Sequence, residues 1–263
     1  MSRIDTAFQQ ARAEKRAAFV PYLTAGFPTR DAFLQHARTV LAHADLLEVG
    51  LPYSDPLGDG PTIQRSSELA LEAGVTTADV FDMIHTLRSE TDKPIVVMTY
   101  YNPMYCYGQG GEAGFLRDLA AAGGDGVILP DLPPDEAGTV IDTAREIGLD
   151  TVFLTAPTST PERVALVTDA CRGFVYAVSV TGVTGAREAT SSEVPSLVGR
   201  IREATDLPIA VGFGVSNAAT AAPVAAVADG VVVGSALIRT IAEGGDLDGL
   251  AREIAGACRR GDA

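Results

Sequence analysis

The sequence holds only three cysteines and three histidines among its 263 residues, so few side chains are available for metal binding or disulfides. Cys106, Cys171 and Cys258 are widely separated and lack the Cys-x-x-Cys spacing of zinc sites. The histidines show no metal-ligand spacing with neighbouring carboxylates, and positions on helix surfaces account for them. We therefore expect no metal site and no disulfide framework.

Lysine is also scarce. Lys15 and Lys93 are the only lysines, the other 18 of the 20 basic residues are arginines, and the net charge is −14. This balance disfavours nucleic-acid binding, because contacts to phosphates need a basic face. Two interpretations of the acidic, lysine-poor composition stay open: the ordinary surface of a soluble protein, or adaptation to a high-salt habitat.

No apolar run approaches the roughly 20 residues that are needed to cross a bilayer. The N-terminal stretch 1–18 alternates charged with apolar residues and lacks the apolar centre of a signal peptide. We therefore expect a cytoplasmic protein with no membrane association. Apolar residues nevertheless make up 46% of the chain, which is enough for one large core.

Short apolar segments alternate with helical segments along the whole chain. The expected strands are 17–25, 46–50, 94–101, 125–130, 151–157, 173–180, 208–214 and 229–235. The expected helices are 2–14, 31–44, 65–73, 77–88, 111–122, 133–148, 160–171, 192–205 and 217–228, followed by two more at the end. Apolar strands that alternate with helices form a parallel sheet, and eight such units in this length favour a closed barrel. The predicted fold is an α/β (β/α)8 TIM barrel, a single domain over 1–263 with an extra N-terminal helix.

The stretch Leu46–Gln64 contains two carboxylates in unusual settings. Glu48 lies within an apolar strand, where a carboxylate is costly unless it is paired or used. Asp59 lies in the loop that follows, which is rich in glycine and proline. One carboxylate on a rigid strand and another on the next loop suit acid/base catalysis. Two alternatives stay open, because Glu48 could instead pair with an arginine and Asp59 could be a turn residue.

Active sites of this barrel form at the carboxyl ends of the strands, so polar residues there are candidates. Tyr100 and Tyr176 either pack against neighbours or line a flat aromatic ligand. Asp131, which lies between prolines, is either a turn former or a site residue.

Glycines recur at the ends of the last three expected strands, in the segments 182–185, 212–214 and 234–235. Glycine lets backbone N–H groups approach an anion closely. Ser235 also begins a short predicted helix after the eighth strand, whose N-terminus favours a phosphate group. The sequence thus predicts a phosphate site and a small phosphorylated substrate.

Seven segments resemble the tryptophan synthase alpha subunit family over essentially the full length. They are FVPYLTAGFP, LLEVGLPYSDPLGDGPTIQ, MTYYNP, ILPDLPPDE, FVYAVSVTGVTGAR, GFGVS and DGVVVGSALI. The resemblance implies a lyase of tryptophan biosynthesis, which cleaves indole-3-glycerol phosphate to indole and D-glyceraldehyde 3-phosphate by a retro-aldol reaction. It implies no cofactor in this subunit. It also implies a beta subunit partner that carries pyridoxal phosphate, converts the indole to L-tryptophan and forms an α2β2 tetramer with this chain.

The functional positions of the family carry over onto this sequence. The resemblance implies that Glu48 and Asp59 are catalytic. The implied substrate-binding residues are Tyr22, Tyr100, Leu129, Tyr176, Thr184 and Phe213. The implied phosphate-binding residues are Gly185, Gly214, Gly234 and Ser235. The implied residues facing the beta subunit are Pro52, Asp55, Pro56, Asn102, Pro103 and Asp131.

The residue types fit the implied reaction. Glu48 can protonate C3 of the indole ring and then accept the proton of the glycerol hydroxyl, which needs a pKa near neutrality. Asp59 can hydrogen-bond the indole N–H and stabilise the positive charge that develops there. Thr184, on the loop after the expected strand 173–180, would hydrogen-bond Asp59 when this loop and the loop of Asp59 close over the site. Tyr22 departs from the phenylalanine of many members and adds a hydroxyl to the pocket. The competing interpretations are a stand-alone indole-glycerol-phosphate lyase and a catalytically silent activating subunit.

Overall fold

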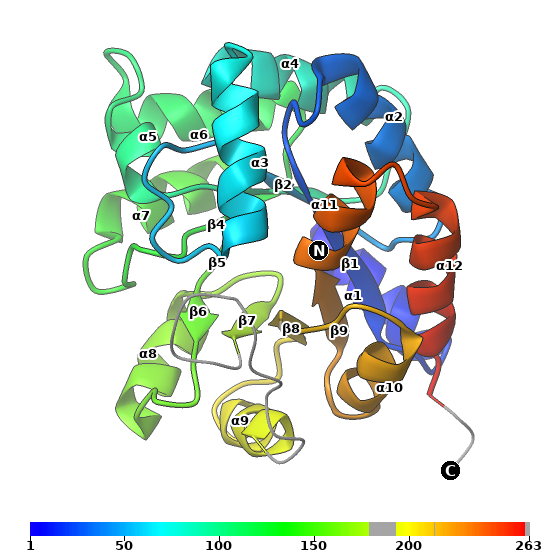
Figure 1. The fold of residues 1–263 in the computed structure, drawn as a ribbon. Coiled ribbons are helices and arrows are strands. Elements are labelled where there is room, and N and C mark those ends of the chain that lie inside the picture. The colour runs from blue at the N-terminus through cyan, green and yellow to red at the C-terminus, as the bar shows by residue number, and fades with distance from the viewer. Residues whose placement is uncertain (179–192, 213, 261–263) are drawn as a thin grey trace.

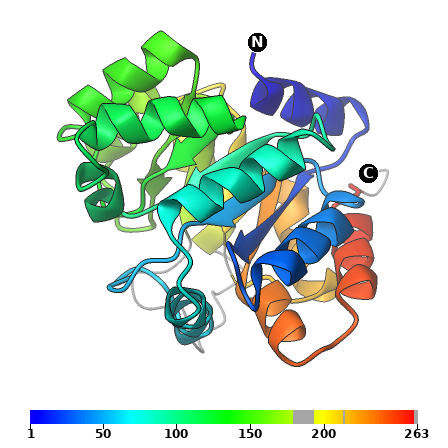
Figure 2. The ribbon, with the colours of Figure 1, turned by 90° about the horizontal axis from the view of Figure 1, so that it is seen from above.

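The computed structural model describes residues 1–178, 193–212 and 214–260, and in these ranges twelve helices accompany nine parallel strands (Figures 1 and 2). The strands are β1 (Ala18–Thr24), β2 (Leu47–Gly50), β3 (Ile95–Met98), β4 (Gly126–Ile128), β5 (Asp150–Val152), β6 (Leu154–Thr155), β7 (Val175–Val178), β8 (Ile209–Gly212) and β9 (Gly230–Val233). Hydrogen bonds join them in the order β5-β4-β3-β2-β1-β9-β8-β7-β6.

The two ends of this sheet, β5 and β6, are consecutive parts of one extended segment and are separated only by Phe153. β5 pairs with β4 and β6 pairs with β7, so the segment joins both edges and closes the sheet. The predicted strand 151–157 is therefore divided, and all eight predicted strand units are present. The (β/α)8 barrel is confirmed, whereas a single domain over the whole of 1–263 stays a prediction.

Alternate residues of each strand point into the barrel or outward, which produces two apolar layers. The inner layer contains Val20, Leu46 and Val96 together with residues of the other strands. The outer layer packs strand residues such as Val49 against the helices. Glu48 has the parity of Leu46 and therefore faces the interior of the barrel.

The outer helices follow the strands in turn. They are α2 (Arg30–Leu41), α3 (Pro61–Glu72), α4 (Thr77–Arg88), α5 (Tyr101–Tyr105), α6 (Gly111–Ala122), α7 (Gly138–Ile147), α8 (Pro161–Ala170), α9 (Glu193–Arg202), α10 (Ala218–Val227), α11 (Ser235–Ala242) and α12 (Leu247–Ala257). Several begin at a side chain that accepts a hydrogen bond from the first turn, as Thr29, Thr76 and Asn217 do. In the described ranges, no helix has the length and apolar character needed to span a membrane.

The predicted extra helix, α1 (Arg3–Ala13), closes the amino end of the barrel. Its buried residues Ile4, Phe8 and Ala11 pack against the inner layer, and the Phe8 ring lies 5.4 Å from that of Phe174. The carboxyl ends of the strands lie at the opposite end of the barrel, where this fold forms its active sites.

Two predicted helix boundaries are wrong because of proline. α3 begins at Pro61 rather than near residue 65, since proline suits the first position of a helix, where its missing N–H is not needed. α7 begins at Gly138 rather than at residue 133. Pro133 and Pro134 form a turn there, and each of their carbonyls accepts a backbone hydrogen bond from three residues further on.

The predicted strand 94–101 is also too long. β3 ends at Met98, and Tyr101 begins the short helix α5, which the sequence pattern did not indicate. The carboxylate of Asp131, from the loop after β4, accepts a 2.9 Å hydrogen bond from the Tyr101 N–H. The chain turns at this point because of a contact 30 residues away in the sequence.

Candidate active site

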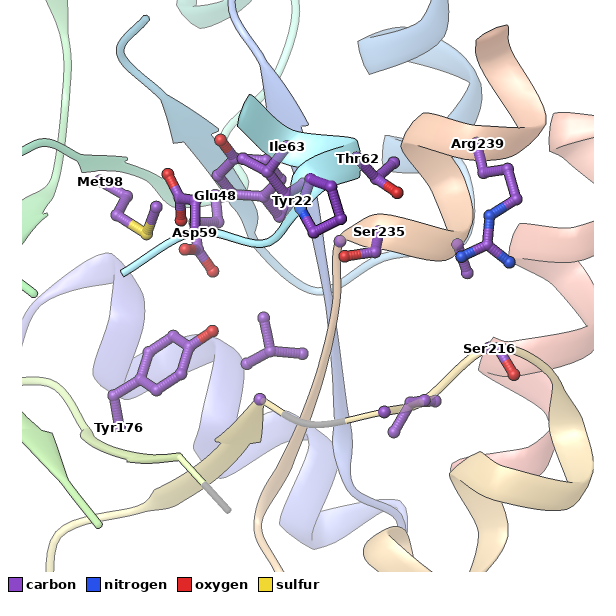
Figure 3. A pocket seen from close by; sticks show the side chains of 17 residues that line it. Tyr22, Glu48, Asp59, Thr62, Ile63, Met98, Tyr176, Ser216, Ser235 and Arg239 are labelled. Atoms are coloured by element: carbon purple, nitrogen blue, oxygen red, sulfur yellow. The ribbon is translucent and has the colours of Figure 1, made fainter. Parts of the chain in front are cut away.

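A cavity of about 470 Å³ lies at the carboxyl end of the strands, a size typical of small-molecule sites (Figure 3). It is lined by Tyr22, Glu48, Asp59, Pro61, Thr62, Ile63, Met98, Tyr176, Gly212, Gly214, Val215, Ser216, Val232, Gly234, Ser235, Ala236 and Arg239. The two predicted catalytic carboxylates and three of the predicted phosphate-binding residues therefore line one cavity.

The strand register places Tyr22 beside Glu48. The two residues are direct partners in the β1–β2 pair, so their side chains leave the sheet on the same side. That side is the barrel interior, because Leu46, two residues before Glu48, belongs to the inner layer. The floor of the cavity is thus the last inward-facing layer of the barrel.

Glu48 is 1% exposed, and within the described part of the chain neither of its carboxylate oxygens has a hydrogen-bond partner. The alternative of an ion pair with an arginine is therefore not seen in these ranges. Burial, and secondarily the charge of Asp59, raise the pKa of Glu48 to about 8. At neutral pH the carboxyl group is mainly protonated, so it can donate a proton to a molecule in the cavity.

Asp59 reaches the same cavity from the loop between β2 and α3 (Figure 3). Its N–H donates to the carbonyl of Pro56 at 3.0 Å, and the Tyr100 hydroxyl donates to its carboxylate. Burial raises the pKa of Asp59 to about 6, and the hydrogen bond from Tyr100 opposes this shift. At neutral pH Asp59 is mainly ionised while Glu48 is protonated, and such a separation is typical of paired catalytic carboxyl groups.

Two tyrosines face the cavity, Tyr22 from β1 and Tyr176 from β7 (Figure 3). A Cβ on Gly50 would come within 2.0 Å of the Tyr22 hydroxyl. A Cβ on Gly212 would likewise come within 2.3 Å of the Tyr176 hydroxyl. Both glycines are therefore needed for the close approach of a phenol. Burial raises the pKa of both tyrosines well above its usual range and keeps them neutral.

Three of the residues predicted to bind phosphate, Gly214, Gly234 and Ser235, line the cavity, and Ser235 marks its far side, away from Glu48 and Asp59 (Figure 3). Gly214 has φ +51°, a left-handed conformation that favours glycine. Gly234 is the N-cap of α11 and Ser235 is its first residue, as the sequence predicts. The first N–H groups of a helix lack partners within the helix and, with its dipole, favour an anion.

Some predicted residues do not line the cavity. Thr184, Gly185 and Phe213 lie outside the described residues. Leu129 is 1% exposed, and its N–H donates to the Val152 carbonyl. Tyr100 is buried, and its hydroxyl interacts with the carboxylate of Asp59.

The cavity also contains residues that the sequence analysis missed, among them Met98, Ser216 and Arg239. Met98 is the last residue of β3, and its position at the carboxyl end of a strand could have indicated that it lines the site. Arg239 follows Ser235 by four residues on α11, and residues at this spacing share one face of a helix.

The residues predicted to face a partner come from three segments that contact one another. Asp55, Asn102 and Asp131 are exposed, whereas Pro52 is buried; Pro56 and Pro103 are half-buried. The Tyr101 N–H donates to the Asp131 carboxylate and so joins two of these segments, and the Gly58 N–H donates to the Tyr100 hydroxyl and so joins the third.

Leu57 and Tyr105 belong to the same segments and were missed. Leu57 is 87% exposed and Tyr105 is 62% exposed, which is unusual for large apolar side chains.

Comparisons with known proteins agree with one another. The sequence profile of the family described as "Tryptophan synthase alpha chain" matches residues 8–257. The chain is 55% identical over 261 residues to the tryptophan synthase alpha chain of Deinococcus radiodurans, covering 99% of this chain and 96% of that one. It is 46% identical over 262 residues to that of Mycolicibacterium paratuberculosis, covering 98% and 95%.

Solved structures give the same result. A structure of Mycobacterium tuberculosis tryptophan synthase superimposes with a TM-score of 0.92 at 46% identity and covers 99% of each chain. The tryptophan synthase subunit alpha of Legionella pneumophila superimposes with a TM-score of 0.88 at 32% identity and covers 98% of each chain.

Proposed function

Since this chain belongs to the tryptophan synthase alpha chain family, we propose that it is a lyase in which Glu48 and Asp59 cleave indole-3-glycerol phosphate. The products are indole and D-glyceraldehyde 3-phosphate. The observation that carries the proposal is the buried carboxyl group of Glu48, which has no hydrogen-bond partner among the described residues and whose pKa of about 8 makes it a proton donor at neutral pH. Its environment is costly for folding and useful for general acid catalysis.

The first step moves a proton from Glu48 to C3 of the indole ring. C3 becomes tetrahedral, and the ring nitrogen takes up positive charge as an indoleninium ion. Asp59, which is mainly ionised at neutral pH, accepts a hydrogen bond from the ring N–H and stabilises that charge. Glu48 thus donates the proton, and ionised Asp59 stabilises the positive charge that results.

The second step breaks the bond between C3 and the first glycerol carbon. Its electron pair flows into the ring and neutralises the nitrogen, which leaves indole. The hydroxyl on the first glycerol carbon loses its proton to the Glu48 carboxylate and becomes the aldehyde of glyceraldehyde 3-phosphate. Glu48 ends the cycle protonated, so the proton balance closes without another group.

The far side of the cavity would hold the phosphate of the substrate. Gly214, Gly234 and Ser235 supply backbone and hydroxyl groups there, at the start of α11. With the phosphate fixed at this side, the indole ring extends toward Glu48 and Asp59, between Tyr22 and Tyr176. Holding both ends of the substrate lowers the entropic part of the barrier.

The same family membership supports a beta subunit as the partner, with pyridoxal phosphate bound there, an α2β2 assembly and a cytoplasmic location. We define the partner face as the exposed residues Asp55, Leu57, Asn102, Tyr105 and Asp131. It adjoins the loop that carries Asp59, so the partner can influence the position of this carboxylate. Indole released in the cavity would pass to the beta subunit.

The decisive experiment follows indole release from indole-3-glycerol phosphate, with and without a cognate beta subunit. Glu48→Gln should lower turnover by roughly 10²–10⁴-fold, the usual contribution of general acid–base catalysis, while inorganic phosphate still binds. Glu136→Gln, which changes an exposed carboxylate outside the cavity, should leave turnover as it is.

The results also separate the competing functions. Wild-type protein that releases no indole under either condition would exclude a lyase and favour a silent activating subunit. Full turnover by Glu48→Gln would remove Glu48 from the mechanism. Turnover that is already maximal without the beta subunit would favour a stand-alone lyase.

A further inference from the structure

Arg239 lines the cavity on the same side as the predicted phosphate-binding residues. It lies on α11, four residues after Ser235, so both side chains project from one face of this helix. Figure 3 shows its side chain extending from α11 toward the space between Ser235 and Ser216. The family roles carried over from the sequence include no charged side chain for the phosphate.

The charge of Arg239 is not used elsewhere in the described part of the chain. Other arginines form ion pairs with aspartates. Arg16 pairs with Asp45 at 2.6 Å and Arg88 with Asp125 at 2.5 Å, and Arg202 pairs with Asp229. Arg239 forms no ion pair or side-chain hydrogen bond with any described residue. Among the described residues, Arg239 therefore leaves a positive charge uncompensated beside this cavity, in a protein whose net charge is −14.

The cavity is also electrically divided. Glu48 and Asp59 lie together on one side, and Arg239 lies on the other (Figure 3). Consider a substrate with an anionic end and a neutral, flat end. Asp59 repels its anionic end, and Arg239 attracts it. A guanidinium presents several N–H donors in a fixed plane, which suits the oxygens of a phosphate.

We propose that Arg239 binds the phosphate group of the substrate through its side chain and so sets the direction in which the substrate enters the cavity. This role rests on the proposed function and adds a charged ligand to the backbone groups at the start of α11. Arg239 does not touch the reacting atoms, so it contributes to binding and orientation and not to proton transfer.

The effect of removing the charge should be moderate. Arg239 is exposed, so water and salt screen its field. A well-formed hydrogen bond to a charged group is stronger than one between neutral groups. Exposure reduces this, and we expect about a tenfold loss of phosphate affinity, a factor that corresponds to about 1.4 kcal/mol.

The test compares Arg239→Gln and Arg239→Lys with wild type. Calorimetry gives the Kd of inorganic phosphate, and indole release in the presence of the beta subunit gives KM and kcat. Arg239→Gln should raise both Kd and KM about tenfold and leave kcat within about twofold, since the loss is uniform in ground and transition states. Arg239→Lys should recover part of the affinity, and the difference between wild type and Arg239→Gln should shrink as salt is added.

Arg252→Gln is the matched control. Arg252 is an exposed arginine on the neighbouring helix α12, pairs with Asp248 at 3.5 Å and does not line the cavity. Unchanged Kd and KM in Arg239→Gln, or equal changes in Arg252→Gln, would overturn the role of Arg239. If wild-type protein releases no indole, the proposed function fails, and the phosphate titration still decides whether Arg239 binds the anion.

Discussion

The backbone N–H of Gly58 donates a 2.9 Å hydrogen bond to the hydroxyl of Tyr100, and this hydroxyl in turn donates to the carboxylate of Asp59. One phenol therefore holds both the loop and the carboxylate that the loop carries. Because the bond stabilises the ionised form, it holds the pKa of Asp59 below the value that burial alone would give.

Tyr100→Phe should therefore raise the pKa of Asp59 above about 6 and lower turnover at neutral pH. We expect roughly a tenfold decrease in kcat, the scale of one hydrogen bond to a charged group. The acidic limb of the pH–rate profile should move to higher pH. Tyr107→Phe is the control, because its hydroxyl donates at 2.7 Å to Asp118, outside the cavity. A fall in kcat without movement of the acidic limb would contradict a direct effect on Asp59.

The opposite protonation states of Glu48 and Asp59 predict a bell-shaped dependence of kcat/KM on pH. Below about pH 6 Asp59 gains a proton and loses its charge, and above about pH 8 Glu48 loses the proton that it must donate. Indole release measured from pH 5 to 10 should therefore be fastest between these values, with apparent pKa values that belong to the coupled pair.

The substrate phosphate also titrates near pH 6, since its second pKa is about 6. Measurement of kcat at saturating substrate separates this contribution, because it reports only the groups of the bound complex. A basic limb that persists unchanged in Glu48→Gln would show that another group is the acid.

The buried carboxyl of Glu48 should also make stability depend on pH. Its pKa is about 8 in the folded protein against 4.5 for an ordinary glutamate, so the folded state binds more protons between these values. The free energy of unfolding must then fall as pH rises from about 4.5 to 8.

Glu48→Gln removes this titration. The free energy of unfolding of the variant minus that of wild type should therefore increase by on the order of 3 kcal/mol from pH 5 to pH 8.5. Urea unfolding at both pH values measures the difference. If the difference in the free energy of unfolding between variant and wild type is the same at pH 5 and pH 8.5, Glu48 is not protonated in the folded protein.

Much of this site could be predicted from the sequence because its chemistry is local. Glu48 stands out as a carboxylate inside an apolar strand, and the strand continues through it in the structure as expected. The start of α11 at Ser235 follows from glycine and the helical pattern after it. The barrel itself follows from the alternation of strands and helices.

Contacts between distant segments could not be predicted. The end of β3 depends on Asp131, which binds the Tyr101 N–H across 30 residues of sequence. The control of Asp59 by Tyr100 depends on how two loops meet. Arg239 looks like any surface arginine in the sequence, and only the structure shows that it borders the cavity without a carboxylate partner among the described residues.

Two buried hydroxyl groups join β1 to α3, the helix that follows the loop of Asp59. The Thr24 and Ser66 hydroxyl oxygens are 2.6 Å apart, and Ser66 also donates to the carbonyl of Ile63 at 2.8 Å. Ile63 lines the cavity, so this pair fixes part of its wall.

Thr24→Val and Ser66→Ala should each lower the free energy of unfolding by about 1–2 kcal/mol, because each leaves a buried hydroxyl with fewer partners. The double variant should be destabilised by about 1 kcal/mol less than the sum of the two single effects, and this difference is the coupling energy of the pair. Chemical denaturation of the four proteins measures the cycle. Thr39→Ala, which removes an exposed hydroxyl bonded only to its own helix, should change stability by less than about 0.5 kcal/mol. Strict additivity would show that the 2.6 Å contact contributes no coupling.

The last prediction concerns the partner face. Leu57 is 87% exposed on the loop next to Asp59, and a large apolar side chain in this position is better explained by contact with another chain than by folding. Leu57→Asp places a charge in the proposed interface, where an unpaired buried charge opposes binding. We expect the Kd for the beta subunit to rise by at least about tenfold, a typical effect at a central interface residue. Titration of the beta subunit against indole release should then need proportionally more partner for half-maximal stimulation, while saturating partner restores the plateau.

Leu166→Asp is the matched control, since Leu166 is 40% exposed on α8, which carries no residue of the partner face. Equal effects of the two substitutions would indicate a general loss of solubility, and no effect of Leu57→Asp would place the interface elsewhere on the barrel.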